Sequence, residues 1–191
     1  VLVDIPKDIS QGPCPASLPQ ETDLPGNSIP THGSLERLEE AAELLSNAER
    51  PVLLIGHGVV IAEASKAVTK LAERLGAPMV TTLLGKGGTD ETHPLHLGML
   101  GMHGTAYANK ATDAADLIMS IGSRWDDRIT GKLDEFCLGA KKIHVDIDPT
   151  EIGKNIEVDV PIVGDVKRVL TQRNKRVKSS THVRYRALWT L

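Results

Sequence analysis

Two arginines and two aspartates stand together directly after an apolar run of the chain. Arg124 and Arg128 flank Asp126 and Asp127, and residues 116–122 (DLIMSIG) precede them. A guanidinium group can donate two parallel N–H bonds to a phosphate or a carboxylate, so the arginines are candidates for binding an anionic ligand. Ion pairing with the neighbouring aspartates is an equally good interpretation, and the sequence leaves both open.

Glycine follows most of the apolar runs, which is typical of a backbone that must approach a ligand closely. The segment Gly56-His57-Gly58 resembles the start of a dinucleotide-binding fingerprint, although Ile61 stands where a third glycine would be expected. Taken alone, this segment fits a tight structural turn as well as it fits a phosphate-binding loop.

A glycine-rich loop at residues 97–104 (LGMLGMHG) contains Met102 and His103. The methionine is flexible and polarizable and suits contact with a planar ring, and a histidine in such a loop is a ligand candidate. His93 and His96 are close by at i, i+3 spacing. No third ligand or supporting carboxylate pattern accompanies them, so no metal site is expected.

Two aspartates, Asp146 and Asp148, end the apolar run at residues 142–148. Either could accept hydrogen bonds from ribose hydroxyls, and a helix-capping role for Asp148 before Pro149 is comparably favoured. The sequence has no nucleophile elbow, no defensible Ser/His/Asp order and no carboxylate pair arranged for acid–base work. The residues therefore predict a nucleotide-cofactor-binding domain without its own reaction centre.

These candidates need a scaffold that gathers the ends of several apolar runs. Short apolar runs predict strands at residues 51–56, 78–82, 116–122, 142–148 and 158–163, and helical spacing predicts helices at residues 34–45, 59–75, 105–113 and 165–172. Pro161 indicates an edge strand or a strand end. Strands that alternate with helices favour an α/β fold with an open parallel sheet, whose ligands bind beyond the carboxyl ends of the strands.

The composition agrees with that fold. Of 191 residues, 40% are hydrophobic but only 3% aromatic, which predicts an aliphatic interior. No apolar run approaches the roughly 18 residues that a membrane span needs. Cys14 and Cys137 lack metal spacing, so a reduced intracellular protein is expected.

The two ends of the chain have a different character from the middle. Val1 to Pro6 reads as a strand, and a proline-rich stretch without core residues follows. Because the chain begins inside an apolar run, we expect an excised piece of a longer protein. Residues 166–191 carry eight of the 22 basic residues and none of the 25 acidic ones, and a solvated linker is favoured over a nucleic-acid arm.

Three long segments closely resemble the large catalytic subunit of the acetolactate synthase family. They are residues 97–109 (LGMLGMHGTAYAN), 121–136 (IGSRWDDRITGKLDEF) and 144–169 (HVDIDPTEIGKNIEVDVPIVGDVKRV). The resemblance implies a three-layer αβα open parallel sheet of Rossmann-like type. It assigns residues 1–9 to the end of a pyrimidine-binding domain, 10–32 to a Pro-rich linker, 33–172 to a central FAD-binding domain and 173–191 to a basic linker.

The resemblance also implies an activity. The family uses thiamine diphosphate and Mg²⁺ to condense pyruvate with a second 2-ketoacid, with loss of CO₂, on the way to branched-chain amino acids. Its catalytic and metal-binding residues belong to the other domains, so none is assigned here and the segment alone should be inactive. The expected partners are 2-ketoacids, further copies of the chain and a regulatory small subunit, without nucleic acid or membrane. The expected location is the bacterial cytoplasm or a plastid, not a secreted state.

The family's site residues can be carried over to this sequence by motif. Those implied to lie along FAD are Gly56, His57, Gly58, Thr82, Leu83, Leu84, Gly101, Met102, His103, Gly104, Gly122, Ser123, Arg124, Asp126, Arg128, Asp146, Ile147, Asp165 and Val166. Met102 and Arg128 are further implied to face the substrate channel, with Arg128 pairing with the carboxylate of the second ketoacid. Two alternatives stay open: another thiamine-diphosphate carboligase or oxidase of the glyoxylate carboligase or pyruvate oxidase type, and a noncatalytic nucleotide-binding module.

Overall fold

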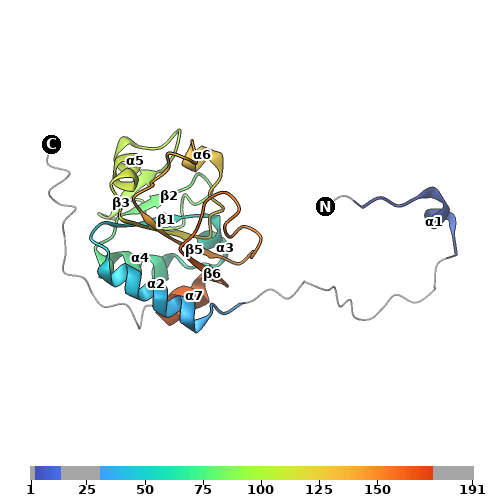
Figure 1. Cartoon of the computed structure of the whole chain (residues 1–191), viewed down its shortest axis with the longest axis horizontal. Coiled ribbons are helices and arrows are strands. Elements are labelled where there is room, and N and C mark those ends of the chain that lie inside the picture. Colours follow the sequence, from blue (N-terminus) through green and yellow to red (C-terminus); the bar gives the residue numbers. More distant parts are fainter. Residues whose placement is uncertain (1–2, 14–30, 174–191) are drawn as a thin grey trace.

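A sheet of parallel strands forms the centre of the computed structural model, which describes residues 3–13 and 31–173 (Figure 1). The strands are β1 (Pro51–Ile55), β2 (Met79–Thr81), β3 (His96–Met99), β4 (Leu117–Ile121), β5 (Lys141–Asp146) and β6 (Val160–Val163). Their order across the sheet is β3-β2-β1-β4-β5-β6, and every neighbouring pair is parallel. The predicted open parallel α/β sheet is confirmed.

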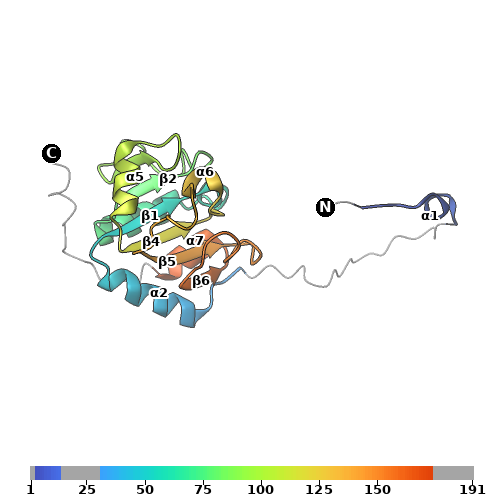
Figure 2. The same ribbon diagram turned by 45° about the horizontal axis from the view of Figure 1, so that its top comes forward.

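Helices cover both faces of this sheet. Figure 1 shows α2 (Leu35–Asn47), α4 (Ser65–Leu75) and α7 (Val166–Arg173) below it, with α5 (Ala106–Asp113) and α6 (Asp127–Thr130) above, and the turned view in Figure 2 again has α2 below and α5 above. The short helix α3 (His57–Ile61) contacts α4 and α7. A further short helix, α1 (Lys7–Gln11), precedes the sheet in the chain. The three-layer αβα arrangement is therefore confirmed. None of the helices in residues 3–13 and 31–173 has the length and apolarity needed to cross a membrane.

The strands are buried on both faces, and alternate residues serve different cores. On β1, Leu53 and Ile55 belong to the core under α2, α4 and α7, whereas Val52 and Leu54 belong to the core that contains Trp125. Fully burying one such side chain is worth roughly 1.5–3 kcal/mol. This two-sided burial explains why the central strands have unbroken apolar sequences.

Two predicted elements differ from the structure, and one observed strand was not predicted. The helix expected at residues 59–75 is broken into α3 and α4, because Glu63 adopts a left-handed backbone with φ +49°. Strand β3 lies in a stretch for which no strand was predicted, since its apolar run is interrupted by Gly98 at φ +94°. Residues 3–6 form no strand, because no strand among the described residues pairs with them.

Further sequence predictions concern the edge of the sheet and the two terminal segments of the chain. Pro161 lies in β6, which is an edge strand of the sheet as predicted. Most of the proline-rich linker (14–30), together with Cys14, and nearly all of the basic C-terminal segment (174–191) lie outside the described residues.

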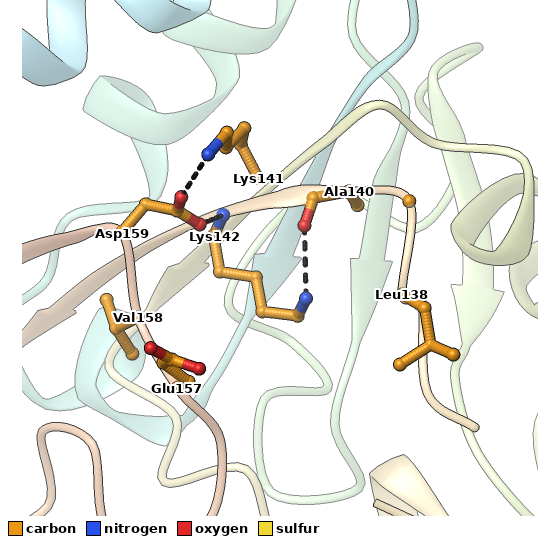
Figure 3. Close-up of a pocket in the computed structure, with 8 residues that line it drawn as sticks. Leu138, Ala140, Lys141, Lys142, Glu157, Val158 and Asp159 are labelled. Carbon is orange, nitrogen blue, oxygen red and sulfur yellow. Dashed lines mark hydrogen bonds and ion pairs between the residues drawn. The ribbon is translucent and has the colours of Figure 1, made fainter. Parts of the chain in front are cut away.

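An ion-paired hollow lies where β5 begins and β6 approaches it. Figure 3 shows this hollow, of about 310 Å³, between residues 138–142 and 157–159. The Asp159 carboxylate accepts a bond from Lys141 Nζ at 2.6 Å and one from the Lys142 backbone N–H at 2.8 Å. Lys142 Nζ in turn donates to the carbonyls of Cys137 and Ala140. The bonds of these charged groups are all made within the protein. They join the start of β5 to the segment that leads into the edge strand β6.

The carboxylate of Asp159 should make stability depend on pH. Burial raises its pKa, but the bonds from Lys141 and Lys142 outweigh that effect, so its pKa lies below the ordinary value of 3.8. A carboxyl whose pKa is lowered by folding stabilises the fold above its unfolded pKa, and this stabilisation is lost as the pH falls through the folded pKa.

We therefore expect Asp159→Ala to lower the free energy of unfolding of the chain by about 1–2 kcal/mol at neutral pH. The difference from wild type should shrink as the pH is lowered through the range in which the carboxyl titrates. Urea unfolding at pH values on both sides of that range measures both effects. The control is Glu157→Gln, a change at an exposed neighbour that should stay within about 0.5 kcal/mol of wild type. A pH-independent loss for Asp159→Ala would contradict this account.

Candidate functional site

The strand order reverses between β1 and β4, and a crevice opens beyond their carboxyl ends. The chain leaves β1 toward β2 and β3, whereas it leaves β4 toward β5 and β6, so the two connections diverge. Open α/β sheets bind ligands at such a reversal point. Here it holds a cavity of about 600 Å³, lined by His57, Thr82, Leu83, Leu84, Gly122, Ser123, Arg124, Asp126, Arg128, Ile129, Asp146 and Glu151.

A second hollow of about 280 Å³ adjoins the first, and both share Gly122 and Asp146. Its lining comes from the start of the β1 connection and from the ends of β5 and β6: Gly58, Ile61, Ala62, Gly122, Asp146, Ile147, Asp165 and Val166. We call the two hollows together the crevice. Ten of the predicted site residues line the first hollow, and Gly58, Ile147, Asp165 and Val166 are added by the second.

The walls of the crevice meet at glycines. Gly56 N–H donates to the Ile121 carbonyl at 2.9 Å, and Gly58 N–H donates to the Gly122 carbonyl at 3.1 Å. Gly122 has φ +63°, and a Cβ atom placed on it would lie 2.6 Å from Cα of Gly58. The two strand ends therefore approach so closely that only glycine fits at Gly122.

The arginine loop (residues 122–128) places two cations at the crevice. The side chains of Arg124 and Arg128 are 67% and 70% exposed, and their contacts with Asp126 and Asp127 are long, at 3.8 and 3.9 Å. The local ion pairing that the sequence left open is thus present, but such exposed pairs contribute little energy. The guanidinium groups can turn to an anionic ligand at small cost.

Carboxylates from the ends of β5 and β6 also line the crevice. Asp146 lines both hollows, and one of its oxygens accepts the Asp148 N–H at 3.0 Å. Asp148 lines neither. Its carboxylate accepts the backbone N–H and the hydroxyl of Thr150, and these bonds lower its pKa. Asp148 therefore forms a local turn with Thr150, and the helix-capping interpretation is wrong. Asp165 accepts the Arg168 N–H at the start of α7.

Five predicted residues are not among those that line the crevice: Gly56, Gly101, Met102, His103 and Gly104. They are nevertheless joined to it. Met102 N–H donates to the Arg128 carbonyl at 3.1 Å, and a Cβ on Gly101 would collide with that same carbonyl. The side chain of Met102 is exposed, as are Leu83 and Leu84. The glycine-rich loop thus lies against the arginine loop and adds an apolar side chain near it.

His57 connects two sides of the crevice. Its Nδ1 lies 2.8 Å from the Leu84 carbonyl, so the residue after β1 is bonded to the loop after β2. Because a carbonyl only accepts, Nδ1 carries the proton in this contact.

Sequence reasoning missed two residues of the main cavity, Ile129 and Glu151. Glu151 Oε1 accepts from Lys154 Nζ at 2.8 Å, whereas Oε2 is buried and has no hydrogen-bond partner among the described residues. A buried acceptor without a partner is costly, and a bound donor would satisfy it. The sequence signal was weak, because Glu151 lies five residues beyond the end of β5.

The remaining histidine and cysteine candidates have structural roles. Nδ1 of His93 accepts the Leu95 N–H and Nδ1 of His96 accepts the Gly98 N–H, so both stabilise their own loop. Residues 3–13 and 31–173 contain no cluster of three potential metal ligands. Cys137 is a free, buried thiol, and burial raises its pKa to about 12.

The fold and the crevice define a doubly wound α/β domain with a candidate ligand site at the point where the strand order reverses. Comparison with known proteins specifies the family: the model described as "Thiamine pyrophosphate enzyme, central domain" matches residues 38–172. The chain belongs to this family.

Individual relatives are more specific. The chain is 51% identical over 172 residues to the acetolactate synthase large subunit IlvB1 of Mycobacterium tuberculosis, covering 90% of this chain. It is 46% identical over 180 residues to the acetolactate synthase large subunit of Corynebacterium glutamicum. The chain spans only 28% and 29% of these relatives' lengths. A solved structure from Mycobacterium smegmatis, described as a thiamin diphosphate-dependent enzyme, matches with a TM-score of 0.68 and 28% identity, covering 83% of this chain and 31% of that one.

The close approach at Gly122 generates a prediction. Gly122→Ala should destabilise the chain by roughly 3 kcal/mol or more, since it combines a left-handed backbone with a collision against Gly58. The matched control is Gly76→Ala, because Gly76 has φ +62° but no atom within 4 Å of an added Cβ. That control should cost only about 1 kcal/mol of backbone strain. Urea unfolding measures the free energy of unfolding of both variants. Equal losses of stability would contradict the claim that an added Cβ at Gly122 collides with Gly58.

Proposed function

We propose that this chain is the FAD-binding central domain of an acetolactate synthase, an enzyme that condenses two 2-ketoacids with loss of CO₂. The substrates would be pyruvate with pyruvate or with 2-ketobutyrate. The observation that carries the proposal is the crevice at the strand reversal, where two exposed guanidinium groups, three carboxylates and two exposed leucines line one cavity. An elongated dinucleotide with phosphates, hydroxyls and a flat apolar ring needs this combination.

The chain's residues fit FAD in three respects. Gly56, Gly58 and Gly122 have no side chains, which would leave room for the FAD phosphates to approach the chain beside the cation of Arg124. The second hollow, with Asp146 and Ile147 and with Asp165 and Val166, would take the adenosine half. The rest of FAD would lie against the remaining predicted residues. These are His57, Thr82, Leu83, Leu84, Gly101, Met102, His103, Gly104, Ser123, Asp126 and Arg128. FAD undergoes no net redox change in this condensation.

Substrate contacts from this domain would come from Arg128 and Met102. The exposed guanidinium of Arg128 would pair with the carboxylate of the second ketoacid, and the exposed side chain of Met102 would form an apolar wall beside it. Thiamine diphosphate and Mg²⁺ would be held by other domains of the enzyme. Under this proposal residues 33–172 form the central domain and the chain by itself turns over no pyruvate.

The relatives' designation as large subunits supports a further point of the proposal, that the intact enzyme works with a regulatory small subunit. The enzyme would also contain more than one copy of the catalytic chain. It would act in the bacterial cytoplasm or in a plastid.

FAD binding tests the cofactor assignment. The intact protein should bind FAD, as followed by flavin fluorescence, and Glu151→Gln should weaken binding by about tenfold. Lys154 holds Oε1, so the introduced amide would present N–H groups where the cavity now offers an acceptor. Glu157→Gln makes the same chemical change at an exposed site beside the start of β5 and should bind as wild type does. Absence of FAD binding by the folded intact protein would refute the cofactor proposal.

The substrate assignment has a separate test. In the intact enzyme, Arg128→Ala should raise the KM for the second ketoacid by roughly tenfold or more, because the carboxylate loses a charge-assisted bond. Lys132→Ala is the control: Lys132 is an exposed cation on the same segment and is paired with Glu135 at 3.0 Å. Steady-state kinetics with pyruvate and 2-ketobutyrate as competing acceptors give the values. An unchanged acceptor KM for Arg128→Ala would contradict the assignment.

A further inference from the structure

Two buried polar side chains meet beneath the arginine loop. Ser120 on β4 and His144 on β5 are register partners in the sheet, and both are fully buried. Their side chains reach the same atom: Ser120 Oγ lies 3.1 Å and His144 Nε2 lies 2.7 Å from the Ser123 carbonyl oxygen. One inward-facing carbonyl of the arginine loop thus has two buried donors from the central strands.

The contact determines the state of the imidazole. Since a carbonyl oxygen only accepts, Nε2 of His144 carries a proton. Nδ1 is buried without a partner among the described residues, and burial is the largest influence on the ring, lowering the pKa of His144. His144 is therefore a neutral Nε2–H donor.

The loop above these donors has a backbone that requires support. Trp125 has φ +54°, a region that bulky residues rarely adopt. Its ring is buried and packs edge-on against the ring of His144, with centroids 6.0 Å apart. Asn155 Nδ2 also donates to the carbonyls of Arg124 and Trp125, both at 3.1 Å. The loop is held from inside by buried groups while its arginine side chains remain in solvent.

We propose that His144 and Ser120 are positioning residues, which hold the Ser123 carbonyl inward and thereby set where Arg124 and Arg128 stand at the crevice. Their importance for ligand binding rests on the proposed function, but their hold on the loop does not. A purely space-filling role would place no demand on hydrogen-bond donors at these positions. Here two side chains donate to one buried carbonyl. We therefore infer that these positions require hydrogen-bond donors, because a buried carbonyl without a hydrogen bond is costly.

Hydrogen exchange in the intact protein, read by mass spectrometry in a peptide covering residues 122–131, tests the hold on the loop. His144→Leu removes the donor and Ser120→Ala removes the second donor with minimal change in volume. Each should speed exchange in that peptide by about five- to tenfold. His144→Gln can place an amide N–H near the former Nε2 and should restore exchange to within about twofold of wild type.

The matched control is Thr112→Val, which deletes another fully buried hydroxyl bond, to the Ala108 carbonyl within α5. This variant should lower the free energy of unfolding of the whole chain. It should not speed hydrogen exchange in residues 122–131 more than it speeds exchange in the strands of the sheet. FAD titration of the same variants adds the functional readout: His144→Leu and Ser120→Ala should bind about tenfold more weakly, and His144→Gln and Thr112→Val as wild type does.

The outcomes separate the two proposals. Faster loop exchange in His144→Leu and Ser120→Ala, with rescue by His144→Gln, supports the positioning role even if the wild-type protein binds no FAD, a result that would refute only the cofactor. If His144→Leu does not fold, Ser120→Ala and His144→Gln decide by the same exchange criterion. Loop exchange that matches Thr112→Val in the donor-deleting variants, or a His144→Gln variant no better than His144→Leu, would overturn the positioning role.

Discussion

The contact between the carboxyl ends of β1 and β4 is the constraint on which the rest of the site depends. Gly58 donates its N–H to the Gly122 carbonyl, and the two backbones lie so close that Gly122 has no room for a side chain. The strand order reverses at this point, so the two chains that leave it diverge to opposite halves of the sheet. The crevice is the space that this divergence leaves, and its position follows from the topology before any lining residue is considered.

The arginine loop has an irregular backbone, yet it holds two cations at a defined place beside the crevice. Its inner side is buried: the Trp125 ring packs in the same core as Val52 and Leu54 of β1, and the Ser123 carbonyl accepts from Ser120 and His144. Its outer side carries Arg124 and Arg128 in solvent. These inner contacts come from two adjacent strands, so the loop is anchored to both β4 and β5.

How far the fold could be predicted depended on how burial is distributed along each strand. The runs that form β1, β4 and β5 were recognisable because residues such as Leu53 and Leu54 face opposite cores, which leaves the sequence apolar throughout. Strand β3 is short, only partly buried and interrupted by Gly98, so no such run marks it. The break at Glu63 was hidden because neither glycine nor proline stands there, and the apolar spacing continues across it.

The sequence by itself determined which chemical groups follow each strand: glycines after β1 and β4, arginines after β4 and carboxylates after β5 and β6. It also identified the family, since long contiguous motifs survive in the chain's order. Only the tertiary structure decided which of these groups share a cavity, and it added Glu151 while committing Asp148 to a local turn. It alone paired His144 and Ser120 with one carbonyl. The physical reason is that cavities and buried hydrogen bonds join residues from different strands, and spacing along one chain carries no record of which atoms will meet across the sheet.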